Sequence, residues 1–322
     1  MKRIFSIAFC AIIMFTFSAC GKKSSAEYEM GTGLVAEIKG EDGEAVLSGT
    51  VASVVMDGEG KIVECRLDAI ENKVDIDDGT IDLDDIREEF ETKQEQGIDY
   101  GMKEASSIGR EWYEQADHFG NYVEGLTVEQ VGAIGTDSET KTDQIILSGC
   151  TIDISDFVKA IVLACNDEYK KSFKSSDFKL GLGVYSKISN EDITEDSIKM
   201  KVTVSSAVVN KQGETLAVLV DTMEPVIKFN NSGVVTNLGE AAKTKKSLGD
   251  DYGMKKASKI GLEWYEQADA FEKYVVGLDA TGVNSIMLTD DKRPEDNILR
   301  AGCTIAIDDF MHAVYKAINY AE

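Results

Sequence analysis

Hydrophobic and polar residues alternate in two stretches of the chain, each followed by a cluster of turn-forming residues. The run over residues 51–56 splits its side chains between two faces of an extended chain, and Asp, Gly and Glu residues fill positions 57–60. A similar run over 204–209 leads into Asn, Lys, Gln and Gly at 210–213. Alternation that ends in such a cluster predicts two β-hairpins.

A different periodicity follows, typical of amphipathic helices. Apolar or small residues recur at helical spacing behind Asp99, which predicts one long helix with Asp99 as its N-cap, and Asp251 has the same role in a second copy. The stretches 147–152 and 300–305 are then expected to be short strands. Each is expected to lead into a further helix, the first capped by Asp153 or Ser155.

These patterns occur twice because the sequence contains an internal repeat. Two segments of similar sequence begin at Asp99 and Asp251, and roughly three positions in four are identical between them. The predicted fold is therefore α+β, with two tandem units that each pack an antiparallel sheet against helices. We place unit 1 at residues 31–165, a polar linker at 166–180, and unit 2 at 181–322.

The N-terminus has the pattern of a lipoprotein signal peptide over residues 1–20. Lys2 and Arg3 precede an apolar run that is too short to span a bilayer, and small residues lead to Cys20. We expect Cys20 to carry the lipid, and residues 21–30 to form a polar tether. The chain is then expected at the cell membrane, anchored by lipid and facing the extracytoplasmic side.

Charge and cysteine content narrow the possible partners. A net charge of -24 repels nucleic acid, so membrane lipid, through the anchor, is the expected contact. Four cysteines remain after the signal region, too few for a disulfide framework in a chain of this length. We expect these four, Cys65, Cys150, Cys165 and Cys303, to be buried free thiols.

Familiar metal and nucleotide motifs do not fit this sequence. The acidic run over residues 75–85 fails the calcium-loop register, because placing Gly79 at the invariant glycine puts apolar residues at ligand positions. A hairpin turn is the better interpretation of this run. The two histidines, His118 and His312, have no ligand partner at metal-binding spacing. No metal site is therefore predicted.

The repeated Gly-Cys-Thr segments and one tyrosine pair are the candidate site residues. Gly149 and Gly302 are expected to allow a backbone turn that other residues resist, and Thr151 and Thr304 follow close to a helix N-terminus. Such a corner suits a phosphate, although it is also explained as a purely structural turn. Tyr113 and Tyr265 lie one step off an aromatic helix stripe and are the rings that could face a planar ligand.

The motifs "GTGLV", "VVMDGEGKIVECRLD" and "SGCTIDISDF" together resemble the FMN-binding domain of membrane-anchored electron-transfer lipoproteins. In that family a flavin transferase joins FMN, through its phosphate, to the threonine hydroxyl of the last motif. The resemblance implies attachment at Thr151 and Thr304, with Ser148, Gly149, Ala301 and Gly302 as the small residues before them. It also implies a flavin transferase and a membrane redox partner.

The resulting hypothesis is an electron carrier with two FMN units, rather than an enzyme that turns over a substrate. The alternative is a non-redox surface lipoprotein that binds a ligand or partner in a cleft, in which case the tyrosines matter more than the threonines.

Overall fold

The structure, a computed structural model, describes residues 26–41, 43–76, 79–81, 89–136, 146 and 148–321. Cys20 and most of the acidic run at 75–85 therefore lie outside the described residues. The strands are β1 (Ala26–Glu41), β2 (Glu44–Met56), β3 (Ile62–Asp75), β4 (Lys171–Ser175), β5 (Lys179–Lys187), β6 (Ser197–Lys199), β7 (Lys201–Val209), β8 (Thr215–Met223) and β9 (Val226–Lys228). The α-helices are α1 (Lys93–Gln96), α2 (Trp112–Val123), α3 (Val128–Gly132), α5 (Ser155–Cys165), α6 (Lys245–Leu248), α7 (Trp264–Val275), α8 (Ala280–Asn284), α9 (Asn297–Arg300) and α10 (Asp308–Asn319).

Among the described residues, all strand pairings are antiparallel, and the strands form three sheets with the orders β3-β2-β1-β4, β5-β7-β8 and β6-β9. The two predicted hairpins are confirmed. The Asp57 carboxylate accepts the backbone N–H groups of Glu59 and Lys61, and Asn210 accepts those of Gln212 and Glu214. Short polar side chains stabilise such turns by accepting hydrogen bonds from the backbone that follows them.

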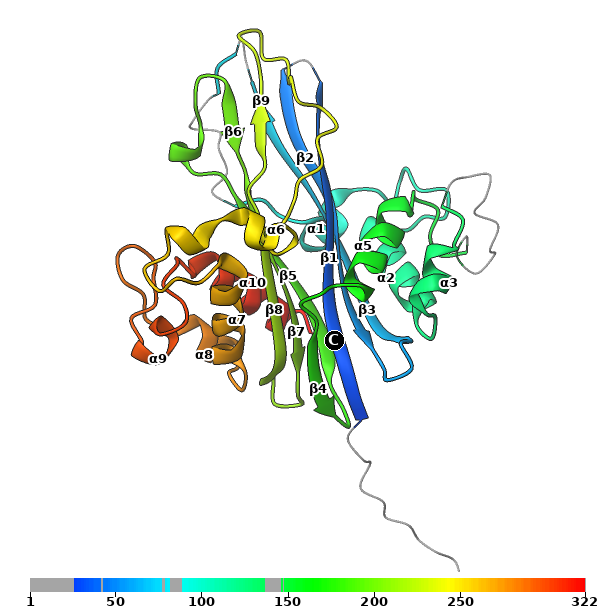
Figure 1. The fold of residues 1–322 in the computed structure, drawn as a ribbon. Coiled ribbons are helices and arrows are strands. Elements are labelled where there is room, and N and C mark those ends of the chain that lie inside the picture. The colour runs from blue at the N-terminus through cyan, green and yellow to red at the C-terminus, as the bar shows by residue number, and fades with distance from the viewer. Residues whose placement is uncertain are drawn as a thin grey trace, which may run out of the picture.

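The sheets of the two units pack face to face in the middle of the molecule (Figure 1). One buried cluster contains Leu47 and Ile70 from unit 1 together with Val184 and Val202 from unit 2. A polar contact also crosses between the sheets, where the hydroxyl oxygens of Thr32 and Ser206 lie 2.6 Å apart. The inner faces of both sheets are thus removed from water by each other.

Helices cover the outer face of each sheet, as Figure 1 shows with unit 1 in cyan to green and unit 2 in yellow to red. In unit 1, α2 and α5 bury Phe119 and Phe157 against β2 and β3. In unit 2, α7 and α10 bury Phe271 and Phe310 in the same way. The order of layers is helices, sheet, sheet, helices, and the predicted α+β class is confirmed.

Close passage of a helix over a strand fixes the position of α5 on β1. A Cβ atom added at Gly31 would lie 2.0 Å from the carbonyl oxygen of Ala164, so only glycine fits there. Gly181 has the matching relation to Ala317 of α10, at 1.8 Å. The Gly-x-Gly segments at the start of the two units therefore serve helix packing.

Several local predictions were wrong. The helix expected behind Asp99 begins only at Trp112, where Glu111 is the N-cap, and Asp99 lies instead in a 3₁₀ helix over Gly97–Tyr100. Asp251 is likewise inside a 3₁₀ helix rather than at an N-cap. The strands expected at 147–152 and 300–305 are absent among their described residues; in the second copy α9 leads through a turn directly into α10.

The expected tether and linker also contain strand. β1 begins at Ala26, and Met30 is fully buried, so residues 26–30 belong to the sheet rather than to a polar tether. β4 occupies the expected linker and pairs with β1 over Ala26–Met30. In the part of the chain that the structure describes, none of the helices combines the length and apolar character needed to cross a bilayer.

Candidate functional site

The Gly-Cys-Thr corners hold their threonines near the surface. Thr151 is exposed and Thr304 is half-buried, whereas Cys150 and Cys303 just before them are fully buried. The corner therefore turns its thiol into the core, whereas its threonine stays at or near the surface.

A buried glutamine on the neighbouring helix fixes each corner. Gln115 of α2 accepts hydrogen bonds from the backbone N–H of Thr151 at 2.9 Å and from its hydroxyl at 3.2 Å. Its amide group donates to the carbonyl oxygen of Arg110 at 3.1 Å. Gln267 of α7 makes the same contacts with Thr304, at 2.9 and 3.2 Å, and donates to Leu262. Since an unpaired buried amide is costly, both glutamines are held tightly in place.

The glycines of the corner have a different role from the predicted one. Gly149 and Gly302 are not among the described glycines with positive φ, so no forbidden backbone turn is required there. A Cβ atom added at Gly149 would lie 2.2 Å from the ring of His118, and one at Gly302 would lie 2.7 Å from Cβ of Ala270. The corner needs glycine because the adjacent helix packs directly against it.

The other predicted site residues have different surroundings. Ser148 is exposed in the turn before Cys150. Tyr113 is half-buried and packs against the core of unit 1. Tyr265 donates a hydrogen bond to Asp250 at 3.1 Å, and its ring centroid lies 5.4 Å from that of Tyr169.

The helix that follows the first corner already has an anionic partner. Asp153 accepts the backbone N–H of Ser155 at 2.8 Å, at the start of α5. At the start of α10, Asp309 forms ion pairs with Lys187 and Lys201 at 2.5 and 2.6 Å. The helix N-termini therefore contribute less to phosphate binding than the sequence suggested, and the hydroxyl groups remain as the reactive feature.

The thiols are poor nucleophiles. Cys65, Cys150, Cys165 and Cys303 are free and buried, as predicted. Burial raises the pKa of Cys165 to about 11 and that of Cys303 to about 12, and it raises the pKa of Cys65 further. Because the thiolate is the reactive form, none of these three groups is activated at neutral pH.

A cleft of about 530 Å³ lies between the two units, away from both threonines. Its walls are residues 32–36 of β1, Leu163 of α5, residues 166–169, Val204, Asp221, and residues 241–244 with 246 and 247. Two further cavities, of about 440 and 560 Å³, lie beside α8 and beside the 57–60 turn. Neither Thr151 nor Thr304 lines any of the three.

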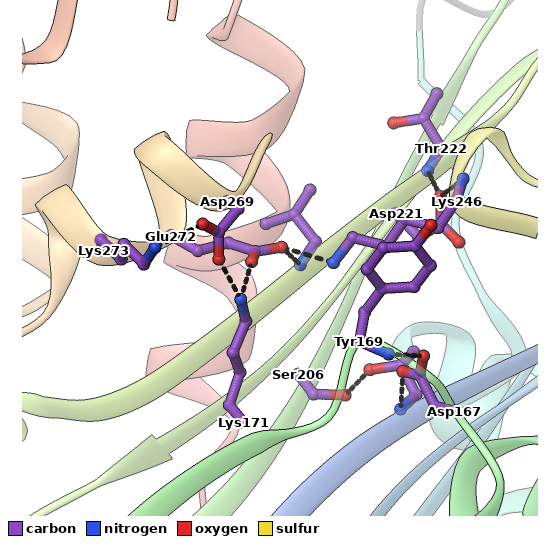
Figure 2. Close-up of polar contacts among 12 residues, drawn as sticks. Asp167, Tyr169, Lys171, Ser206, Asp221, Thr222, Lys246, Asp269, Glu272 and Lys273 are labelled. Carbon is purple, nitrogen blue, oxygen red and sulfur yellow. Dashed lines mark hydrogen bonds and ion pairs between the residues drawn. The ribbon is translucent and has the colours of Figure 1, made fainter. Parts of the chain in front are cut away.

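A buried ion-pair cluster adjoins the cleft (Figure 2). Glu272 of α7 lies 2.7 Å from the ammonium nitrogen of Lys246 and 2.6 Å from that of Lys171 in β4. Lys171 also pairs with Asp269 at 2.6 Å. Burial alone would lower the pKa of Lys171, but Glu272 and Asp269 outweigh it and the pKa is raised. The cluster thereby joins α7 of unit 2 to the strand that pairs with β1.

This cluster was not predicted from the sequence, although two differences between the repeats point to it. At aligned positions, unit 1 has Gln94 and Gly120 where unit 2 has Lys246 and Glu272. Two opposite charges gained together in one copy of a repeat indicate a contact between them. The third member, Lys171, lies in the expected linker and has no such counterpart.

Comparison with known proteins shows similarity over part of the chain. No family model matches the chain, and no solved structure matches it significantly. A segment of 93 residues is 33% identical to a chlorophenol reductase of Desulfitobacterium hafniense. That match covers 26% of this chain and 28% of the reductase, so the chain spans well under half of that relative's length.

Proposed function

We propose that the protein is a lipid-anchored extracytoplasmic electron carrier that holds FMN on Thr151 and Thr304. The observation that carries the proposal is the shared geometry of the two threonines. Each threonine lies at or near the surface, and its hydroxyl donates to the buried glutamine that fixes the corner, at 3.2 Å in both units. The resemblance of the surrounding motifs to FMN-binding domains supports FMN as the group attached to these threonines.

The chain's contribution to attachment is a positioned hydroxyl. In ester formation the threonine oxygen bonds to the phosphorus of the FMN part of a flavin donor, and its proton passes to solvent or to the transferase. The donor's phosphoanhydride bond breaks, and the other half of the donor leaves as a phosphate monoester. Gln115 or Gln267 accepts from the hydroxyl before reaction, so the oxygen lone pairs stay directed away from the core. FMN, once bound, supplies one- or two-electron redox chemistry. Chlorophenol reduction is not part of this proposal, because that match covers 26% of the chain.

Intact-mass analysis of the full chain co-expressed with a flavin transferase tests the proposal. Two FMN-sized increments are expected in the wild type and one in Thr151→Ala or Thr304→Ala. Ser148→Ala is the matched control, since it removes a neighbouring exposed hydroxyl and should keep both increments. Unchanged mass in the wild type, or increments that survive both threonine substitutions, would contradict the proposal.

The second candidate function is non-redox binding of a ligand, and the cleft between the units favours it. At about 530 Å³ the cleft is within the usual size of a small-molecule site. Colour separates the two candidates, because a flavin carrier is yellow when purified with flavin and transferase supplied.

A further inference from the structure

The cleft between the units contains an open stretch of strand edge. β4 pairs with β1 only as far as Met30, and the segment at 240–242 takes over at Ala36, where the N–H of Ala242 donates to the Ala36 carbonyl at 3.0 Å. Between these points the N–H of Thr32 is bonded to the Asp167 carboxylate at 3.2 Å. Leu34 has no backbone partner on this edge within the part of the chain that the structure describes.

The direction of the free groups follows from strand geometry. Alternate residues of a strand direct their N–H and C=O groups to the same side. Because Thr32 and Ala36 direct theirs away from β2, those of Leu34 point to the same side, toward the cleft. The gap from Thr32 to Ala36 spans four residue spacings, about 14 Å, enough for an added strand of three residues.

The charges around this edge favour a cation. Asp167, Glu168 and Asp221 line the cleft, and the facing cations are Lys243 and Lys246. Lys246 is already paired with Glu272 at 2.7 Å, and its ammonium group lies 5.2 Å from the centre of the Tyr169 ring. Figure 2 shows Asp167 and Tyr169, from the segment between α5 and β4, and Asp221, from β8, gathered beside this pair. Within the part of the chain that the structure describes, the three carboxylates therefore face Lys243, which forms no ion pair, and Lys246, whose ammonium group also acts on Asp221, so negative charge exceeds positive charge in the cleft.

We infer that the cleft binds a short extended peptide with a positively charged side chain. The peptide backbone adds to the β1 edge at Leu34, and its cationic group lies toward Asp221 and Asp167. Hydrogen bonds to the strand edge supply affinity for any extended peptide, and the carboxylates supply the preference for positive charge. This site is separate from both threonines, so it does not depend on the proposed flavin.

Calorimetric titration of the purified full chain with Ala-Lys-Ala, Ala-Ala-Ala and Ala-Glu-Ala tests this inference. We expect Ala-Lys-Ala to bind at least about tenfold more tightly than Ala-Glu-Ala, a difference of roughly 1.4 kcal/mol. Methylation of the central amide nitrogen of Ala-Lys-Ala should weaken binding, because strand addition needs that N–H. Equal affinity for the three peptides, or no binding by any of them, would overturn the inference.

Two variants separate the cleft from general effects on folding. Asp221→Asn should weaken Ala-Lys-Ala binding, and Asp68→Asn should not, since Asp68 has the same position in unit 1 and lines none of the three cavities described above. Glu168→Gln changes an exposed residue of the cleft wall, so it should fold normally and still lower the affinity. Equal losses in Asp68→Asn and Asp221→Asn would contradict the assignment. Because these titrations need no flavin, their outcome is independent of the mass analysis above.

Discussion

Asp68 in unit 1 and Asp221 in unit 2 occupy matching positions, but the two units surround them with different charges. The Asp68 carboxylate accepts a hydrogen bond from the backbone N–H of Gln94, and the Asp221 carboxylate accepts one from that of Lys246, each at 3.1 Å. Gln94 and Lys246 also occupy matching positions in the two units. In unit 1 the Gln94 side chain is neutral and bonds to the Leu67 carbonyl. In unit 2 the Lys246 side chain is charged and pairs with Glu272.

The same fold thus surrounds a buried carboxylate with a neutral side chain in unit 1 and with a charged pair in unit 2. In unit 1 the neutral Gln94 side chain needs no charged partner. Gly120, which aligns with Glu272 of unit 2, lies against the Cys65 carbonyl. The charged pair in unit 2 extends to Lys171, so α7 is connected to β4 and through it to β1. We therefore expect this buried charge cluster, which has no counterpart at Gln94 and Gly120 of unit 1, to add to the polar contacts between the units.

The largest expected effect is that of Glu272→Ala. This change leaves two ammonium groups, those of Lys246 and Lys171, without their shared partner in the interior. Loss of one member of a buried pair costs about 3–5 kcal/mol of unfolding free energy. Urea denaturation measures the loss, and adding Lys246→Gln, which copies unit 1, should recover part of it.

Lys273→Ala is the control for this prediction. Its ammonium group pairs with Asp269 at 2.6 Å, but the side chain is 75% exposed, and such pairs contribute about 1 kcal/mol or less. The proposed difference between the units fails if Glu272→Ala is no more destabilising than Lys273→Ala.

The glutamine corners are the feature that the units share, so they should respond alike. Gln115→Ala and Gln267→Ala each leave a threonine N–H and a backbone carbonyl without a partner. We expect each to lower the unfolding free energy by about 2–3 kcal/mol. Denaturant titration of both variants checks this, and a difference of more than about 1 kcal/mol would show that the corners are not equivalent.

The smallest effect concerns pH. Burial raises the pKa of Asp68 to about 7, against the lowering effect of Thr92 and of backbone N–H groups. Burial also raises the pKa of Asp221, but the Lys246 ammonium group opposes it and the value is about 6. Because the folded state binds these protons more tightly than the unfolded state, stability decreases as pH rises from about 4 through each folded pKa.

Thermal unfolding between pH 6 and 7 separates the two residues, since Asp68 releases more of its proton in that window than Asp221, which is already half ionised at pH 6. Asp68→Asn should remove a decrease of roughly 1 kcal/mol in that window, whereas Asp221→Asn should remove a smaller one. The reverse order would contradict the charge difference between the units.

Much of the fold could be predicted from local sequence. Alternation and turn residues located the hairpins at 57–60 and 210–213, and the helical spacing behind Asp99 included the residues of α2. The long helix expected from Asp99 failed because Gly101 and Gly109 adopt positive φ and end helical structure before Glu111. The helical spacing of apolar residues did not show that these two glycines interrupt the helix.

The candidate site was predicted less completely, because its contacts span long distances in sequence. Thr151 and Thr304 were identified from a short motif, but the glutamines that fix them lie 36 and 37 positions away. Lys171 lies in the expected linker and Glu272 in unit 2, so no local pattern connects them. Face-to-face packing of the two sheets, which creates the cleft, likewise has no local signature.

Peptide mapping of the full chain, co-expressed with a flavin transferase, tests the central claim most directly. The account predicts an FMN phosphoester on the peptide that contains Thr151 and on the peptide that contains Thr304, with equal occupancy in the two units. Recovery of both peptides unmodified from colourless protein would contradict it.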